Sequence, residues 1–322
     1  MKPSNEAMGA IETIEAKIFR FDPTVDRAPR YETYSVPSRP DMRILDVLDY
    51  VREERGVDIG YRWFCGVKKC GTCGVMVNGR AALACWEPAR PKMVIEPLNN
   101  LPVIRDLLVD RSSYDKKLQE YASFFLERKA PYAGFPEPLT EAQFEPTDRL
   151  RDCIQCLCCY AACPVIGLRD TGFAGPVALV QHALVTLDPR DESANHIATA
   201  ARRMEVFKCV SCYACESACP SEIPIVAHAI EPLKQLIHRN HETPGTRHGK
   251  VFADIVRRLG EIDGPLLVLR TRGFGRQGLR ALMSGFTMML RGKVNPLRSL
   301  FRKPTAAAQE IGKLFELVRR QK

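Results

Sequence analysis

The sequence predicts an α+β protein in which a strand-rich N-terminal region is followed by helical sequence. Alternating apolar and polar residues over 14–21 and 31–36 are typical of half-buried strands. From residue 106 onward these strand signals stop, and apolar residues recur at helical spacing instead. The chain has 322 residues, and its 13 cysteines fall in three tight groups distributed over both regions.

The N-terminal region begins with a predicted hairpin and a predicted helix. Ile14–Phe21 and Tyr31–Val36 are expected to pair, because polar, proline-bearing sequence separates them. A helix is expected next, with Asp41 as its N-cap and Gly56 just past its end. The apolar face of this helix is Ile44, Val47, Leu48 and Val51.

A second hairpin is predicted behind the first cysteine group. Val75–Val77 and Ala81–Ala84 flank Asn78-Gly79, a pair that tight hairpin turns favour. Two hairpins, a crossing helix and a cysteine loop together predict a β-grasp ferredoxin domain over about residues 11–105.

Residues 106–238 are expected to form an all-helical domain. Ser113–Lys129 is predicted to be an amphipathic helix, and a proline-rich connector follows it. Val177–Leu187 and Ala194–Val206 are the next predicted helices. Pro224 lies where the first turn of a further helix tolerates proline. The apolar stripe of that helix is Val226, Ile230, Leu233 and Ile237.

The first cysteine group has the ligand spacing of a plant-type [2Fe–2S] centre. It reads Cys65-x4-Cys70-x2-Cys73, and Cys85 closes it. These four cysteines are therefore the predicted ligands of one [2Fe–2S] cluster.

The second and third groups both follow the bacterial-ferredoxin run that holds cubane clusters. They read Cys153-x2-Cys156-x2-Cys159-x3-Cys163-Pro164 and Cys209-x2-Cys212-x2-Cys215-x3-Cys219-Pro220. In such paired runs the fourth cysteine ligates the other cluster, because the chain folds back pseudo-symmetrically. One [4Fe–4S] centre is therefore expected on Cys153, Cys156, Cys159 and Cys219. The other is expected on Cys163, Cys209, Cys212 and Cys215. The remaining cysteine, Cys158, is predicted to pack as a small buried thiol.

Disulfides and zinc are the alternative uses of so many cysteines. A disulfide scaffold is typical of short secreted proteins, whereas this chain is long and its first residues lack the apolar core of a signal peptide. Zinc also binds Cys-x2-Cys pairs, but zinc ribbons separate two pairs by a loop. Here the cysteines crowd together in two runs that are each followed by proline, which favours clusters over zinc.

Charge is distributed unevenly along the chain. Residues 236–322 contain 18 Lys and Arg against 6 Asp and Glu, a net charge of +12, whereas the whole chain carries +9. A basic tail can face nucleic acid, anionic lipid or an acidic partner, or it can simply be solvated. Residues 239–322 are expected to form a basic, helical C-terminal extension. No apolar stretch approaches the ~20 residues that a membrane helix needs.

The motifs resemble those of the iron–sulfur subunits of succinate dehydrogenase and fumarate reductase over about residues 12–238. The matching segments include Arg62-Trp-Phe-Cys65, Cys70-Gly-Thr-Cys-Gly-Val-Met-Val-Asn-Gly79, Pro102-Val-Ile-Arg-Asp106 and Asp152-Cys-Ile-Gln-Cys-Leu-Cys-Cys159. The resemblance implies a subunit that relays electrons between a FAD-bearing flavoprotein, which handles succinate and fumarate, and a membrane-side acceptor. We expect no catalytic acid, base or nucleophile in the chain itself. Its six histidines show no metal-ligand spacing and are expected to be structural or solvated.

Three departures from the common type of this family bear on the clusters. Cys212 stands where the common type has no cysteine and holds a three-iron cluster, so the full run predicts [4Fe–4S], with [3Fe–4S] as the alternative. Val210 and Val165–Leu168 stand where the common type has the histidine and tryptophan that frame a quinone, which puts that pocket in doubt. Lys68 stands where the family has a glycine, so the family pattern does not determine the backbone path of the [2Fe–2S] loop. Lys68 and Lys69 would favour the reduced [2Fe–2S] cluster.

The tail resembles, on fewer distinctive residues, the C-terminal part of heterodisulfide reductase C subunits. The similar segments are His248–Phe252, the region around Gly285, Leu290–Lys293 and Ile311–Val318. Those proteins pass electrons to a partner with CCG motifs, and non-standard members of the dehydrogenase family use such a partner in place of a haem-binding anchor. The resemblance implies a peripheral subunit on the cytoplasmic side of the membrane, with quinone as a direct or indirect acceptor. Arg276–Lys293 could lie on an anionic surface, but packing against the partner is preferred.

Two other functions remain as alternatives. The first is the iron–sulfur subunit of a heterodisulfide- or thiol-linked reductase, which the identity of the neighbouring subunit would distinguish. The second is a zinc- or cluster-bearing nucleic-acid binder, which only the basic tail suggests. No reader helix or aromatic-basic platform accompanies that tail, so no nucleic-acid partner is expected.

Overall fold

A computed structural model describes residues 13–121, 125–168, 171–272, 288, 291–292 and 302–320. The chain divides into two compact units, Met1–Leu236 and Ile237–Lys322. The first unit contains every cysteine, and the second contains the basic helices of the tail.

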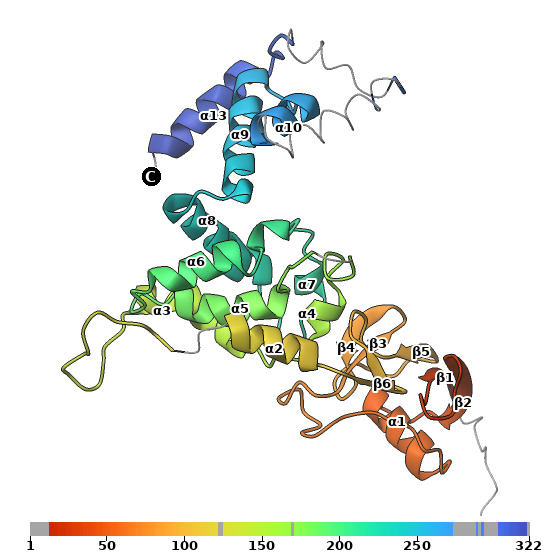
Figure 1. Cartoon of the computed structure of the whole chain (residues 1–322). Coiled ribbons are helices and arrows are strands. Elements are labelled where there is room, and N and C mark those ends of the chain that lie inside the picture. The colour runs from red at the N-terminus through yellow and green to blue at the C-terminus, as the bar shows by residue number, and fades with distance from the viewer. Residues whose placement is uncertain are drawn as a thin grey trace, which may run out of the picture. The chain divides into compact units, whose positions relative to one another are not determined.

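A five-stranded mixed sheet forms the N-terminal part of the first unit (Figure 1). Its strands run in the order β2-β1-β5-β3-β4, and β1 pairs antiparallel with β2 but parallel with β5. Their bounds are β1 (Thr13–Arg20), β2 (Arg30–Pro37), β3 (Gly74–Val77), β4 (Arg80–Leu83) and β5 (Lys92–Glu96). Both predicted hairpins are present. Asn78 and Gly79 have φ values of 48° and 77°, the positive values that a two-residue type I′ turn requires.

The helix α1 (Ile44–Glu53) buries the four apolar residues predicted for its inner face. Its N-cap is Arg43 rather than the predicted Asp41. The side chain of Asp46 inside the first turn accepts a hydrogen bond of 2.6 Å from the backbone N–H of Arg43. Because that carboxylate lies three residues after the cap, it satisfies an amide at the helix start without any help from Asp41.

A buried carboxylate connects the sheet to the segment that leads into the first cysteine loop. The side chain of Asp106 accepts hydrogen bonds from Arg20 Nε at 3.0 Å and from the backbone N–H of Gly60 at 2.8 Å. Asp106 lies between two short strands, β6 (Val103–Arg105) and β7 (Leu108–Val109). The strand β7 lies beyond residue 106, where no further strand was expected, and it exists because it pairs with β6 across this anchored turn.

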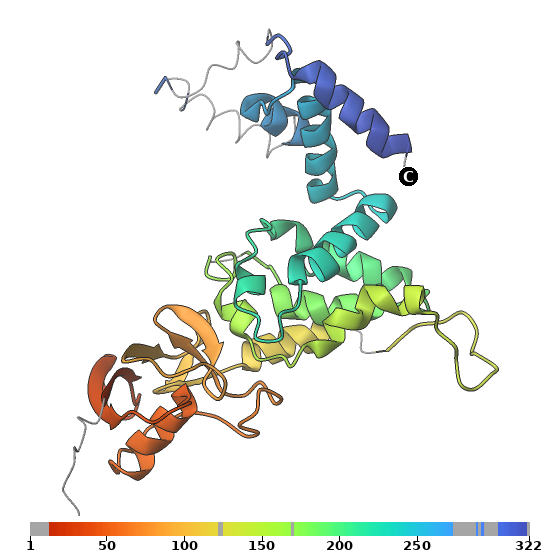
Figure 2. The same cartoon turned by 180° about the vertical axis from the view of Figure 1, so that it is seen from behind.

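Helices make up the rest of the first unit. They are α2 (Ser112–Tyr121), α3 (Glu141–Asp148), α4 (Cys158–Ala161), α5 (Pro176–Thr186), α6 (Ala194–Arg202) and α7 (Ala214–Ser217), followed by a π-helical segment η3 (Val226–Ile230). The helix α8 (Glu231–Asn240) comes next and contains the boundary between the two units. The helix α5 is buried on nearly all sides, and α2 lies beside it in both views (Figures 1 and 2). The stripe predicted for the helix after Pro224 is fully buried.

Two predicted helices are shorter than the sequence suggested. Of the helix expected over Ser113–Lys129, the described part α2 covers Ser112–Tyr121, and residues 125–129 are not helical. Here the backbone N–H groups of Glu127 and Lys129 donate to the side chains of Asp191 and Glu192, at 3.1 and 2.7 Å. These tertiary hydrogen bonds replace helical ones.

The helix expected to reach Val206 ends at Arg202. Glu205 has a φ of 50°, which is outside the right-handed helical region. A single 3₁₀ turn, η2 (Val206–Lys208), then leads directly into Cys209.

The second unit contains α9 (Pro244–Leu259), α10 (Gly264–Arg272) and α13 (Ala308–Arg320). The helices α10 and α13 both pack against α9. The predicted interfacial segment Arg276–Lys293 falls almost entirely outside the described residues. In the part of the chain that is described, no helix combines the length and the apolar character needed to cross a bilayer.

Candidate iron–sulfur centres

Three cysteines of the first group, Cys65, Cys70 and Cys73, lie on a curled loop between α1 and β3, and the fourth, Cys85, follows β4. Gly66, Lys68 and Gly71 have φ values of 69°, 55° and 69°, all in the left-handed region. This conformation turns backbone amides toward sulfur, and Cys65 Sγ accepts hydrogen bonds of 3.4, 3.3 and 3.3 Å from the N–H groups of Val67, Lys69 and Cys70. Hydrogen bonds to sulfur are one of the factors that set the potential of a bound cluster.

Burial and hydrogen bonding act in opposite directions on the thiols of this group. Burial raises the pKa of Cys70, but hydrogen bonds from Thr72 and Cys65 outweigh it and lower that pKa to about 6. Burial dominates at Cys73 and raises its pKa to about 12. A buried thiol of this kind becomes a thiolate readily only when a metal cation replaces its proton.

Lys68 takes the left-handed conformation that suits the glycine it replaces. Its ammonium group lies 4.6 Å from the ring centroid of Trp86, which holds the charge by a cation–π contact. Trp63, Phe64 and Val67 in the same stretch of chain are exposed to solvent.

The second and third cysteine groups, here the first run (Cys153–Pro164) and the second run (Cys209–Pro220), follow the same backbone course. A 3₁₀ turn precedes each run, η1 (Arg149–Asp152) and η2, and each run continues into a four-residue helix, α4 and α7. In the first run Gln155 and Leu157 have φ values of 50° and 66°, and at equivalent positions of the second run Ser211 and Tyr213 have 51° and 62°. Left-handed residues other than glycine are uncommon. Their repetition at equivalent positions therefore shows that the two loops are built alike.

The fold brings the last cysteine of the second run to the first run. A small cavity is lined by Cys153, Cys156, Cys159 and Cys219. Most of its other lining is apolar, including Val177, Val180, Ile223 and Ile225. The four cysteines are those that the sequence assigns to one centre.

Cys163 correspondingly lies near the cysteines of the second run. Burial raises its pKa, and the neighbouring thiols of Cys209 and Cys212 raise it further. Burial also raises the pKa of Cys215 to about 12, with smaller contributions from Cys209 and Cys163. Cys212 is the exposed member of this group.

Cys158 is fully buried, as the sequence predicts. The Cys158 thiol donates a hydrogen bond to Cys156 Sγ. This bond raises the pKa of Cys158 and lowers the pKa of Cys156. Backbone amides and the positive charge of Arg111 add to the lowering at Cys156.

The donor set fits iron–sulfur clusters. All thirteen cysteines are free thiols, and within each group buried thiols raise one another's pKa, a repulsion that bound iron would relieve. A zinc site would need its ligands about 2.3 Å from one ion. Among the described residues, no group of three or more His, Cys, Asp or Glu side chains is arranged to hold a single metal ion.

The [2Fe–2S] loop and the first run meet at a close backbone contact. A Cβ at Gly71 would fall on the carbonyl oxygen of Ile154, and one at Gly74 would lie 3.1 Å from the carbonyl oxygen of Cys156. Glycine at both positions therefore lets the two ligand loops approach. Both glycines belong to the Cys70–Gly79 motif, so the sequence singled them out. It did not indicate that they contact the first run.

Comparisons with known proteins agree with this interpretation of the cysteines. A family model for a 2Fe-2S iron-sulfur cluster binding domain matches residues 15–116, and one for a 4Fe-4S dicluster domain matches residues 149–223. The chain therefore has one [2Fe–2S] domain followed by a domain for two cubane clusters, as the sequence predicts.

Curated relatives carry the names of fumarate reductase subunits. The chain is 33% identical to the fumarate reductase iron-sulfur subunit of Haemophilus influenzae, over 65% of this chain and 88% of that protein. It is 34% identical to a subunit of the CoM/CoB fumarate reductase of Methanothermobacter marburgensis, over 74% of this chain. The match spans only 47% of that longer relative.

A solved structure shares the fold. A chain of the Mycobacterium smegmatis Sdh1 complex in the apo form aligns with a TM-score of 0.65 at 24% identity. The alignment covers 71% of this chain and 97% of the other. The arrangement of a ferredoxin sheet followed by a helical two-run domain is therefore shared with a chain of a known complex.

Proposed function

Because the chain belongs to the family of fumarate reductase iron–sulfur subunits, we propose that it carries electrons between a flavoprotein subunit and a membrane-side acceptor. The substrates of the flavoprotein would be fumarate and succinate. The chain would contribute electron transfer alone, and the acid–base chemistry would belong to the partner.

The observation that carries the proposal is the cavity lined by Cys153, Cys156, Cys159 and Cys219. It supports one [4Fe–4S] site on these four residues and a second on Cys163, Cys209, Cys212 and Cys215. The [2Fe–2S] site would use Cys65, Cys70, Cys73 and Cys85. When bound, such clusters accept and release electrons one at a time. The protein holds their thiolates, donates hydrogen bonds to them and excludes water.

Two exposed surfaces, one beside the first and one beside the last of the three proposed clusters, support docking of partner subunits. Trp63 and Phe64 beside the first cysteine group are exposed, which suits a flavoprotein contact. Val210 and Tyr213 beside Cys212 are 68% and 50% exposed, which suits an acceptor subunit. We propose that this acceptor is a CCG-motif subunit that passes electrons on to quinone, and that the complex lies peripherally on the cytoplasmic side of the membrane.

We also propose that the domains are residues 11–105, 106–238 and 239–322, with the third as the extension that reaches the acceptor subunit. Its resemblance to heterodisulfide reductase C subunits motivates this assignment. A heterodisulfide- or thiol-linked reductase is the less favoured function, because fumarate reductase is the activity that names the relatives.

Low-temperature EPR on the anaerobically purified complex, with iron and sulfide counted, tests the proposal. We expect one [2Fe–2S] and two [4Fe–4S] signals after dithionite reduction, and fumarate or succinate should reoxidise or reduce them. A protein that contains zinc without iron would overturn the proposal. A strong three-iron signal in active enzyme would instead exclude Cys212 as a ligand.

A further inference from the structure

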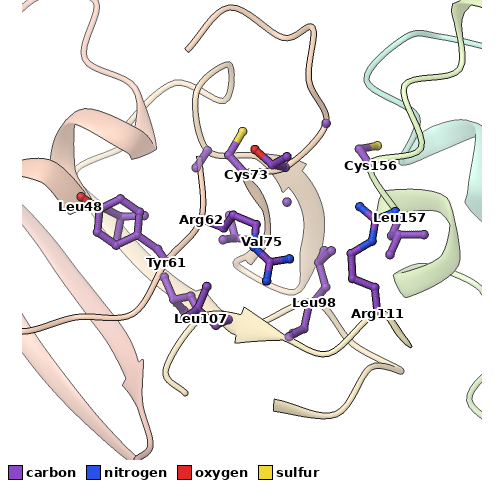
Figure 3. Close-up of a pocket in the computed structure, with 16 residues that line it drawn as sticks. Leu48, Tyr61, Arg62, Cys73, Val75, Leu98, Leu107, Arg111, Cys156 and Leu157 are labelled. Atoms are coloured by element: carbon purple, nitrogen blue, oxygen red, sulfur yellow. The ribbon is translucent and has the colours of Figure 1, made fainter. Parts of the chain in front are cut away.

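A small cavity lies between the [2Fe–2S] loop and the first run (Figure 3). Cys73 and Cys156, proposed ligands of two successive clusters, both line it. Arg111 lines it as well, from the position between β7 and α2, and Figure 3 shows its side chain beside Leu157. A fixed positive charge therefore lies beside the path between two neighbouring redox centres.

The cavity itself offers little to neutralise this charge. Of the sixteen residues that line it, two are arginines, Arg62 and Arg111, and none carries a carboxylate. The acidic partner of Arg111 is Asp115, which lies outside the lining, at 3.4 Å, and its side chain is 46% exposed. Water screens such an exposed carboxylate, so its compensation of the guanidinium is weak.

Packing holds Arg111 in this place. Its guanidinium carbon lies 5.8 Å from the ring centroid of Tyr114, which is fully buried. The Arg111 side chain itself is 27% exposed. Since a guanidinium remains protonated at every physiological pH, the charge is permanent.

We propose that Arg111 raises the reduction potential of the cluster held by Cys156 and, to a smaller degree, that of the [2Fe–2S] cluster held in part by Cys73. This inference rests on the proposed function. Transfer between the two centres removes one electron from one cluster and adds it to the other, and no bond forms or breaks. The added electron makes a cluster more negative, so a nearby positive charge stabilises the reduced form. Arg111 therefore acts through its charge, which stabilises the added electron on the first cubane centre, and it does not itself bind the cluster.

Redox titration of the full complex, followed by EPR at each cluster, tests this role. In the Arg111→Met variant, the equilibrium for reducing the Cys156 centre should fall about tenfold, which is 59 mV for one electron. The [2Fe–2S] centre should shift less, and the centre with Cys209 should not move. Arg111→Lys, which keeps the charge, should restore most of the wild-type potential.

Lys116→Met is the matched control, because Lys116 is an exposed cation on α2 that does not line the cavity. It should leave all three potentials unchanged. A wild-type potential in Arg111→Met, or an equal shift in Lys116→Met, would overturn the role of Arg111. If Arg111→Met fails to assemble, Arg111→Gln is titrated in its place under the same criteria. Wild-type protein without any cluster signal would instead refute the proposed function.

Discussion

The two cubane runs have one backbone design and two different surroundings. Both runs have left-handed residues at the same two positions and a four-residue helix that follows. In the first run Leu157 is 2% exposed and Cys158 is fully buried, and the loop packs against Gly71 and Gly74 of the β-grasp domain. In the second run, by contrast, Tyr213 is 50% exposed.

This difference shows that spacing determines the ligand loop, while the surrounding chain determines what the loop can contact. A buried centre is insulated and can only exchange electrons with its neighbours inside the protein. A centre near the surface can reach a partner. The two cubane centres therefore suit an internal relay, in the first run, followed by transfer to a partner at the surface, in the second. Substitutions at equivalent positions of the two runs should differ in their effects accordingly.

The largest effects are expected from the crosswise ligands. Cys219→Ser should abolish the centre of the first run, although Cys219 belongs to the second, because Cys219 lines the cavity with Cys153, Cys156 and Cys159. Cys163→Ser should abolish the other centre. Iron and sulfide counts with EPR would show which cubane signal disappears in each variant. If each substitution removed the centre of its own run, the crosswise assignment would be wrong.

A smaller effect is expected when the exposed ligand Cys212 is changed instead of the partly buried ligand Cys156. Cys212→Ser should leave a folded protein that retains a three-iron centre, because the site opens to solvent at Cys212. Cys156→Ser should lose the first centre and lower the stability by about 1–3 kcal/mol, because Cys156 lies at the contact with Gly74. EPR of air-oxidised samples and the thermal midpoint measure both. Equal losses in the two variants would contradict the difference between the runs.

The cysteine groups and the hairpins could be predicted from sequence because their signals are local. The Cys-x2-Cys spacing constrains a short loop, and Asn78-Gly79 alone specifies a tight turn. Features set by distant residues could not be predicted. The non-helical course of residues 125–129 depends on side chains some sixty residues away, since the backbone N–H groups of Glu127 and Lys129 donate to Asp191 and Glu192.

The same limit applies within the candidate site. Arg111 has no motif of its own, and its position beside Cys73 and Cys156 arises only when the two domains pack. The start of α1 shows a different limit, because two aspartates near it could each accept a hydrogen bond from a backbone N–H of the first turn. Asp41 was the predicted N-cap, but Asp46, three residues after the actual N-cap Arg43, accepts the hydrogen bond. The backbone of Asp41, with a φ of 60°, placed it outside the helix.

Substituting glycine for Leu157 in the first run and for Tyr213 at the equivalent position of the second separates the effect of side-chain burial on stability from that of backbone strain. Leu157 and Tyr213 have nearly the same φ, 66° and 62°, so glycine relieves about 1 kcal/mol of strain at either site. Leu157→Gly also removes a buried side chain and should cost about 2–3 kcal/mol net. Tyr213→Gly should stay within about 1 kcal/mol of wild type. Denaturant unfolding of the cluster-loaded protein measures both, and a Tyr213→Gly loss as large as that of Leu157→Gly would mean that Tyr213 is not a surface residue.

The smallest effect concerns the contact that the first run makes with the β-grasp domain. An added Cβ in Gly74→Ala would lie 2.8 Å from Leu98 Cδ1 and 3.1 Å from the carbonyl oxygen of Cys156. The leucine can shift but the carbonyl cannot without moving the ligand loop, so we expect a loss of about 1 kcal/mol. The [2Fe–2S] and first cubane centres should also separate slightly, which weakens the magnetic coupling that EPR detects between reduced clusters.

Gly249→Ala is the control for that substitution, because Gly249 lies exposed in α9 with no atom within 4 Å of the added Cβ. Alanine should stabilise α9 by about 0.5–1 kcal/mol, since glycine is the poorer helix former. It should leave the cluster coupling unchanged. Coupling that stayed at the wild-type value in Gly74→Ala would mean that the spacing of the two centres does not depend on this glycine. The burial of the first run would then come from the packing of α4 against α5 rather than from contact with the β-grasp loop.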